Sequence, residues 1–257
     1  MTTVTTKPTK PKGLLIDITR CIGCNACAEA CKQIHGFPPE REPELSATAL
    51  TVVQEQAERN VRRMCMHCVE PACAAACPVA ALHKTAAGPV LYDADKCIGC
   101  RYCMLACAYG VPRYEWTKVV PFVKKCDMCA ERQAEGKVTA CTEACPVEAT
   151  EFGDRDELLK VAQRRMLEDP KYVQHVYGSE EGGGTCVLWL SDVPFEKLGF
   201  PAATIGKQAR SVLASAALAE VPPVVLVGGG LLGSLYWITQ RRREVALAEA
   251  RERKERS

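Results

Sequence analysis

The sequence predicts an α+β fold in which two cluster-binding modules are related by an internal repeat, with surface insertions and one C-terminal transmembrane helix. Three observations predict this class. Seventeen cysteines occur among 257 residues, far above ordinary usage, and sixteen of them fall into four ordered groups. The groups alternate between two spacing types, which indicates the repeat. A stretch of nineteen residues without a charge, 221–239, lies near the C-terminus.

The two types of cysteine group differ in their spacing. Groups one and three have the spacing C-x2-C-x2-C-x3-C, and each begins with Cys-Ile-Gly-Cys; they comprise Cys21, Cys24, Cys27 and Cys31, and Cys97, Cys100, Cys103 and Cys107. Groups two and four have a longer gap after the second cysteine and close with Cys-Pro-Val; they comprise Cys65, Cys68, Cys73 and Cys77, and Cys126, Cys129, Cys141 and Cys145.

Three chemistries compete for these cysteines. Disulfides suit small secreted domains, but cysteines three or four apart on one short loop mostly cannot reach each other with relaxed geometry. Zinc prefers two separated C-x2-C knuckles with four ligands per ion. Iron–sulphur clusters need three thiolates from one tight loop and one from elsewhere, and in two-cluster bacterial ferredoxins the fourth cysteine of a run ligates the other cluster. The spacing therefore predicts four [4Fe–4S] clusters in ferredoxin-like dicluster modules, with the sixteen grouped cysteines as iron ligands.

Short elements are expected around the cysteine groups. Strands should precede groups one and three at residues 14–17 and 90–92, and short helices should carry the fourth cysteines. Gly23 and Gly99 let the backbone pass close to a cluster. The insertion between groups one and two is interrupted by prolines and ends in a β-prone stretch, residues 49–53, so it is predicted to be a surface excursion ending in a strand.

An amphipathic helix is predicted after group four. Asp154 and Glu157 are spaced as a capping box, the apolar residues 158, 162 and 166 share one helical face, and Pro170 stops the helix. The glycines at 182–184 lack the strand, the Lys-Ser/Thr pair and the helix of a phosphate-binding loop, so nucleotide binding is not expected.

The uncharged stretch 221–239 is long enough to cross a bilayer core of roughly 30 Å. Tyr236 and Trp237 lie near its end, and three arginines, 241–243, follow, so the positive-inside rule places the C-terminus in the cytoplasm. A buried or partner-facing soluble helix is the alternative, given the prolines at 222–223 and the glycines at 228–230. The predicted order is a disordered tail (1–12), the cluster domain (13–205), a linker and transmembrane helix (206–240) and a basic cytoplasmic tail (241–257).

Composition limits the classes of function that the protein can have. Lys and Arg number 33 against 31 Asp and Glu, so no global basic field points to nucleic acid. The four histidines are scattered and the grouped cysteines are engaged, which predicts a non-catalytic electron carrier. A stand-alone enzyme that uses a cluster as its catalyst and a zinc-stapled interaction module are the alternatives. Lysines next to ligands, at 32, 96, 124 and 125, either stabilise reduced clusters or are merely solvated.

Two further residues have alternative roles. His67 sits between two ligand cysteines and is expected to hydrogen-bond sulphur or backbone, with replacement of a ligand as the alternative. Cys186 falls outside every group and is expected to be a buried, inert thiol rather than a redox or metal site.

The chain resembles the four-cluster ferredoxin-like iron–sulphur subunits of membrane-bound respiratory oxidoreductases. The motifs Cys-Ile-Gly-Cys-Asn-Ala-Cys at 21–27, Cys-Met-His-Cys at 65–68, Cys-Ile-Gly-Cys-Arg-Tyr-Cys at 97–103 and Lys-Cys-Asp-Met-Cys at 125–129 carry this resemblance. The resemblance implies that group one pairs with group four and group two with group three. The implied ligand sets are Cys21, Cys24, Cys27 and Cys145; Cys126, Cys129, Cys141 and Cys31; Cys65, Cys68, Cys73 and Cys107; and Cys97, Cys100, Cys103 and Cys77.

Within that family, the segment from Tyr177 to Thr185 looks most like the subunit of quinone-reactive [NiFe] hydrogenases. The beta subunit of respiratory formate dehydrogenase, or of another molybdopterin oxidoreductase, is the rival. The resemblance implies a catalytic partner with its own iron–sulphur relay and an integral membrane quinone- or haem-binding partner. The single span with its C-terminus in the cytoplasm predicts that the cluster domain lies on the periplasmic face of the bacterial cytoplasmic membrane. No signal peptide or twin-arginine pair is visible, which favours the formate enzyme, export with a partner, or a processed start.

Overall fold

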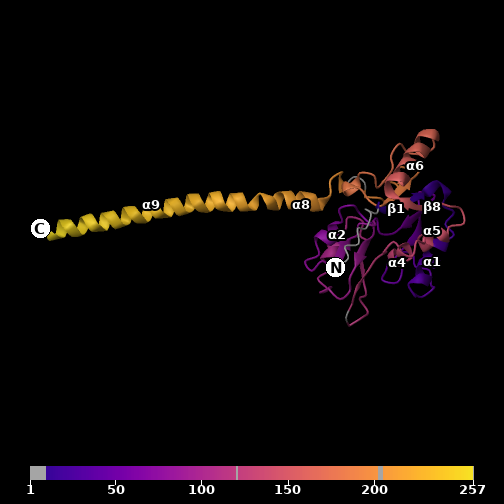
Figure 1. Cartoon of the computed structure of the whole chain (residues 1–257), viewed down its shortest axis with the longest axis horizontal. Helices are drawn as coiled ribbons and strands as arrows, with labels where there is room; N and C mark the ends of the chain where they lie inside the picture. Colours follow the sequence, from indigo (N-terminus) through magenta and orange to yellow (C-terminus); the bar gives the residue numbers. More distant parts are fainter. Residues whose placement is uncertain (1–9, 120, 202–204, 257) are drawn as a thin grey trace, which may run out of the picture. The chain divides into compact units, whose positions relative to one another are not determined.

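The cysteine-bearing part of the chain mixes short strands with short helices, and the computed structural model describes residues 10–119, 121–201 and 205–256 (Figure 1). The strands are β1 (Lys12–Asp17), β2 (Val52–Gln56), β3 (Arg59–Arg63), β4 (Leu82–Lys84), β5 (Val90–Tyr92), β6 (Arg113–Tyr114), β7 (Val123–Lys124), β8 (Thr150–Asp154) and β9 (Val187–Leu190). The helices are α1 (Ala26–Ile34), α2 (Ala72–Ala75), α3 (Tyr102–Ala106), α4 (Ala130–Ala134), α5 (Ala140–Glu143), α6 (Arg155–Glu168), α8 (Arg210–Ala219) and α9 (Val221–Glu255).

Strand β1 is the centre of a three-stranded sheet with the order β8-β1-β9. It runs antiparallel to β8, with Leu14 opposite Phe152, and parallel to β9, with Leu14 opposite Val187. Alternate residues of β1 face opposite sides of the sheet, and Leu14 and Ile16 enter one apolar core while Leu15 enters another, so the apolar run is buried. The strand predicted at 14–17 is thus confirmed and begins two residues earlier, at Lys12. Most of the expected tail, residues 1–9, lies outside the described residues.

The other described strands pair in three antiparallel hairpins, β2-β3, β4-β5 and β6-β7. The strand predicted at 90–92 is confirmed as β5, whereas the one predicted at 49–53 begins at Val52. The turn after β2 explains why the strand continues to Gln56, because Ala57 and Glu58 both have positive φ, 48° and 59°, as a type I′ turn requires. This turn lacks the usual Asn-Gly signal, so sequence reasoning missed β3.

The expectation that short helices carry the fourth cysteines is wrong for three of the four groups. Each third cysteine lies in a helix instead, Cys27 in α1, Cys73 in α2, Cys103 in α3 and Cys141 in α5. Among the fourth cysteines Cys31 is helical, Cys107 is the C-cap of α3, and the other two follow α2 and α5. Those two precede proline, which disfavours helical backbone at the preceding residue.

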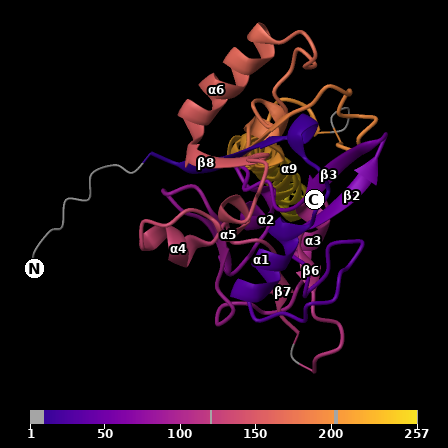
Figure 2. The same ribbon diagram turned by 90° about the vertical axis from the view of Figure 1, so that its right-hand side faces the viewer.

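Helix α6 forms where the sequence predicts, but the capping box does not. Asp154 occupies the N-cap position without a side-chain capping bond, and its carboxylate instead accepts a hydrogen bond from Lys12 across β1 and β8. Glu157 accepts from Lys160 at 3.0 Å. Figure 2 shows α6 continuing from β8, and its buried residues Leu158 and Ala162 join a small core with residues of β1 and β9.

Residues 212–257 form a compact unit separate from residues 1–211. Among the described residues, one helix, Ser211–Lys254, is long and apolar enough to cross a membrane by length and composition. The predicted span 221–239 lies within α9, whose prolines stand in the first turn, where proline is tolerated because that turn needs no backbone N–H donor. Apolar side chains along it, such as Leu226 and Leu232, are exposed.

Candidate iron–sulphur sites

The first C-x2-C loop of each of the four groups turns through left-handed backbone at its third position. Gly23 and Gly99 have φ of 73° and 72° there, and His67 and Met128 have φ of 48° and 56°. Glycine adopts this conformation without steric penalty, while His and Met do so at some cost in strain. A Cβ on Gly23 would approach Asn60 Oδ1 to 2.4 Å. The same tight backbone path therefore recurs at all four cysteine loops.

Helices from distant parts of the sequence bring the cysteine groups together in pairs. Helix α1 of group one packs against α5 of group four, and α2 of group two packs against α3 of group three (Figure 2). This adjacency is a long-range property, because α1 and α5 are more than a hundred residues apart in the chain. It places the fourth cysteine of one group beside the first three cysteines of another.

Three cavities show this arrangement directly. One is bordered by the first three cysteines of group one together with Cys145. A second is bordered by the first three cysteines of group three together with Cys77. A third is bordered by Cys68, Cys73 and Cys107, and Cys65 lies near enough to interact electrostatically with all three. The first two cavities thus have a three-plus-one cysteine border, the pattern that the spacing predicts for a cubane cluster, and the third has this pattern when the nearby Cys65 is included.

The remaining four cysteines lie close together inside the protein. Cys31 interacts electrostatically with Cys141 and Cys129, and Cys126 interacts with Cys31 and Cys141. All four are buried. The sixteen predicted site residues therefore gather into four neighbourhoods, while the ligation of each cluster stays a prediction.

In three of the four groups, the sulphur of the fourth cysteine accepts a hydrogen bond from the backbone N–H of the residue four positions later in the chain. Ala81 donates to Cys77 Sγ at 3.2 Å, Val111 to Cys107 Sγ at 3.5 Å, and Ala149 to Cys145 Sγ at 3.2 Å. Such bonds favour the thiolate form over the thiol and tune the reduction potential of a bound cluster.

Burial makes the metal-free cysteines poor acids. The pKa of Cys31 and of Cys73 is raised to about 12, mainly by burial, with a further contribution from neighbouring cysteines because two thiolate charges repel. Burial also raises the pKa of Cys141, but the Arg62 charge and hydrogen bonds from Thr139 and Arg62 outweigh it, so this pKa lies below its usual value. These sites therefore need a positively charged partner to hold thiolates, which a cluster's iron supplies.

The spacing of the cysteine side chains is compatible with a cubane cluster. Among the residues that the structure describes, no group of three or more His, Cys, Asp or Glu side chains converges closely enough to hold one metal ion. A cubane needs its four thiolates spread apart, because each binds a different iron. The cysteine borders of the cavities fit this requirement.

His67 and Cys186 lie together in the interior. His67 is buried, Val90 N–H donates to its Nδ1 at 3.0 Å, and burial together with Lys125 and Lys84 lowers its pKa well below the usual value. The imidazole is therefore neutral with the hydrogen on Nε2, which agrees with the expected backbone bond. Cys186 is 1% exposed and accepts from Lys84 Nζ at 3.2 Å.

Three of the four lysines next to cluster cysteines pair with carboxylates. Lys32 lies 2.7 Å from Glu42 and Lys96 lies 2.8 Å from Asp93. Lys124 lies 3.8 Å from a carboxylate oxygen of residue 115. Lys125 is buried and donates to the carbonyls of residues 90 and 126. A carboxylate thus cancels most of the positive charge at 32, 96 and 124.

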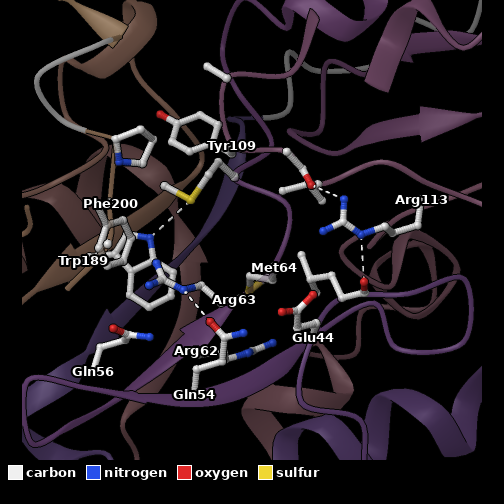
Figure 3. Close-up of a pocket in the computed structure, with 17 residues that line it drawn as sticks. Glu44, Gln54, Gln56, Arg62, Arg63, Met64, Tyr109, Arg113, Trp189 and Phe200 are labelled. Atoms are coloured by element: carbon white, nitrogen blue, oxygen red, sulfur yellow. Dashed lines mark hydrogen bonds between the residues drawn. The ribbon is translucent and has the colours of Figure 1, made fainter. Parts of the chain in front are cut away.

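A larger cleft of about 480 Å³ lies between the β2-β3 hairpin, the loop at 108–113 and the loop after β9. Figure 3 shows Arg62, Arg63 and Arg113 around it with Trp189 and Phe200. Arg63 donates to Gln54 and to the Leu198 carbonyl, and Arg113 donates to two loop carbonyls, so these two guanidiniums tie loops together. No role for Arg62 is predicted from the sequence, because the local sequence of a strand does not show which of its residues will lie next to cysteines distant in the chain.

The fold and the cysteine borders together define a [4Fe–4S] protein. Residues 59–155 match the family model described as a 4Fe-4S dicluster domain. The chain is 38% identical to the hydrogenase-2 operon protein HybA of Escherichia coli O157:H7 over 239 residues, which cover 74% of this chain and 72% of that protein.

Two other relatives come from Escherichia coli strain K12. The B subunit of anaerobic dimethyl sulfoxide reductase is 43% identical over 157 residues, 58% of this chain and 76% of that protein. The iron-sulfur subunit of the nitrate-inducible formate dehydrogenase is 35% identical over 197 residues, 68% of this chain and 66% of that protein. The protein therefore belongs to the family of ferredoxin-like iron–sulphur electron-transfer subunits of multi-subunit oxidoreductases.

Proposed function

We propose that the protein is a four-cluster wire that relays electrons between a hydrogenase-type catalytic subunit and a quinone-reactive membrane subunit. The three-plus-one cysteine border around Cys21, Cys24, Cys27 and Cys145 carries the proposal, since it joins two groups more than a hundred residues apart at one site. Four such sites predict about 16 iron and 16 sulphide per chain. A zinc content with no acid-labile sulphide would contradict it.

The proposed ligand sets follow the helix pairs. The groups-one-and-four module holds one cluster on Cys21, Cys24, Cys27 and Cys145 and another on Cys126, Cys129, Cys141 and Cys31. The groups-two-and-three module holds one on Cys65, Cys68, Cys73 and Cys107 and another on Cys97, Cys100, Cys103 and Cys77. Support comes from the packing of α1 on α5 and of α2 on α3. The two modules are proposed to be repeats of one unit.

The chain's own residues control how electrons pass. A bound [4Fe–4S] cluster supplies a one-electron carrier. The backbone donors from Ala81, Val111 and Ala149 hold their cysteines as thiolates and lower the energy of added negative charge. These three cysteines are half-buried, so solvent screens these electrostatic effects only in part. No general acid or base is needed, because electron transfer leaves the protein's bonds unchanged.

The hydrogenase partner is proposed from the coverage of the HybA relative, and the rival is a formate dehydrogenase or another molybdopterin oxidoreductase. The deciding experiment extracts the native complex gently from membranes and compares hydrogen-driven with formate-driven reduction of a quinone analogue. Hydrogen-driven reduction supports the proposal. Formate-driven reduction alone would replace it with the rival assignment.

The cluster unit is proposed to face the periplasm, with the basic tail in the cytoplasm, because three arginines follow the apolar span. Two introduced cysteines at exposed leucines test this orientation, Leu167→Cys in the cluster unit and Leu247→Cys in the tail. A membrane-impermeant maleimide should label the first in intact spheroplasts and the second after permeabilisation. The reverse pattern would overturn the orientation.

A further inference from the structure

Arg62 is a buried cation on β3 that has no carboxylate partner in the part of the chain that the structure describes. This residue is 3% exposed. Its Nε donates to Thr51 Oγ1 at 2.8 Å, and one terminal nitrogen donates to Thr150 Oγ1 at 3.3 Å. Both acceptors are neutral hydroxyls. The hydrogen bonds therefore orient the guanidinium without cancelling its charge.

The groups that face Arg62 with opposite charge are cluster cysteines. Arg62 borders the same cavity as Cys21, Cys24, Cys27 and Cys145. It also lies near enough to Cys141, Cys27 and Cys126 to interact with them electrostatically. The guanidinium thus lies between the two proposed ligand sets of the groups-one-and-four module.

A buried charge is tolerated when it is paired, and arginine cannot escape the requirement by losing its proton. Other buried arginines usually pair with the carboxylate of an Asp or Glu. Arg62 pairs instead with cysteine sulphur, which carries the necessary negative charge when iron holds it as thiolate. A cubane held by four thiolates is a net anion and gains one more negative charge on reduction. A fixed positive charge beside it therefore stabilises the reduced state more than the oxidised state.

We propose that Arg62 is the shared buried counter-ion of the two clusters of the groups-one-and-four module, and that it raises the reduction potential of both. The inference rests on the proposed ligand sets. It makes Arg62 a tuning residue that acts on both clusters from one position on β3, between the two anionic sites, without being a ligand of either.

The test replaces Arg62 in the intact membrane complex and follows the clusters by EPR-monitored potentiometric titration. Arg62→Gln should lower the ratio of reduced to oxidised cluster at least tenfold at a fixed solution potential, equal to about 59 mV for a one-electron couple. The change should affect the two clusters of the groups-one-and-four module and spare the other two. Arg62→Lys, which keeps the charge, should stay nearer to the wild-type ratio.

Arg63→Gln is the matched control. It removes the same charge one residue along β3, where the side chain points to the opposite face and contacts Gln54, the Leu198 carbonyl and the Phe200 ring. The control should leave all four potentials unchanged. Equal shifts in Arg62→Gln and Arg63→Gln, or no shift in Arg62→Gln, would overturn the inference.

If a substitution causes loss of clusters, the iron content is a second measurement that separates a requirement for the charge from a structural role. If Arg62→Gln fails to retain iron, wild-type iron in Arg62→Lys supports a requirement for the charge. Loss of the same iron from both variants would indicate a purely structural role and overturn the inference. A wild-type complex without four clusters per chain would instead contradict the proposed function, so the two failures are distinguishable.

Discussion

At the scale of single residues, the third position of each C-x2-C loop decides whether the loop can close. Gly23 has a positive φ, and an added Cβ would meet Asn60, whose Nδ2 donates to the Cys21 carbonyl at 3.2 Å. His67 and Met128 show that a side chain is accepted in this conformation when the core has room for it. The loop therefore depends on local backbone freedom and on its neighbour.

Gly23→Ala should destabilise the loop and lower the iron content of the complex. The left-handed conformation costs an alanine about 1 to 2 kcal/mol, and the new methyl group also displaces Asn60 from the Cys21 carbonyl. The control is Gly36→Ala, since Gly36 has a similar φ of 64° with nothing within 4 Å of the added methyl. Iron analysis and thermal melting should show a larger loss for Gly23→Ala, and equal losses would contradict the role of Asn60.

His175 and Glu181 form a pH-dependent pair away from the cysteine loops. The hydrogen bond to Glu181 raises the pKa of His175. Burial raises the pKa of Glu181, but its hydrogen bonds with His175 and with backbone N–H groups outweigh that effect and lower it overall. A raised histidine pKa adds stability that is fully present below the unfolded value of 6.5 and is lost as pH rises through the folded pKa.

Glu181 has the opposite pH dependence. Its contribution to folding stability is present above pH 4.5, the unfolded pKa, and is lost as pH falls through its folded pKa. His175→Asn should therefore lower the melting temperature most in mildly acidic solution. Melting curves recorded between about pH 5.5 and 8.5 should show the difference from wild type shrinking as pH rises. A difference that grows with pH would contradict the ion pair.

At the scale of elements, α6 is held by two different kinds of contact. Arg165 binds both carboxylate oxygens of Glu151 on β8, at 2.5 and 3.0 Å. Leu158 and Ala162 pack against the apolar residues of β1 and β9. This small core contains no cysteine, so α6 stabilises the sheet separately from the cluster sites.

Leu158→Ala should destabilise the cluster unit by about 2 to 5 kcal/mol, the usual effect of emptying a buried leucine site. Leu167→Ala is the control, because Leu167 is 76% exposed on the same helix. Anaerobic thermal melting should separate the two variants clearly. Iron content should stay unchanged in both, and loss of iron from Leu158→Ala would show that this core and the clusters are coupled.

At the scale of the whole molecule, α9 contains the stretch of the described residues that is long and apolar enough to cross a membrane. Its apolar residues are exposed, which suits a lipid environment and not an aqueous one. Ser234 and Thr239 donate back to carbonyls four residues earlier, so these two hydroxyls are satisfied within the helix.

Leu232→Arg should weaken membrane anchoring, because an arginine near the centre of a span adds roughly 2.5 to 3.5 kcal/mol to insertion. Leu247→Arg lies beyond the predicted span and serves as the control. Alkaline extraction of membranes should release more of the first variant than of the second. Equal retention of both would favour the alternative, in which partners and not lipid cover this helix.

The sequence by itself determined the local chemistry: the cysteine spacings that call for cubane clusters, the strands at β1 and β5, the helix at α6 and the apolar C-terminal stretch. Each is a short-range property, set by residues within a few positions of one another. The tertiary structure decided which groups lie side by side, the parallel pairing of β1 with β9, and the placement of Arg62 among the cysteines. These depend on contacts between segments about 30 to more than 150 residues apart, which spacing and composition do not encode. The capping-box prediction was wrong for the same reason. The local pattern assigned the Asp154 carboxylate to a helix cap, but this carboxylate accepts a hydrogen bond from Lys12, which is distant in sequence.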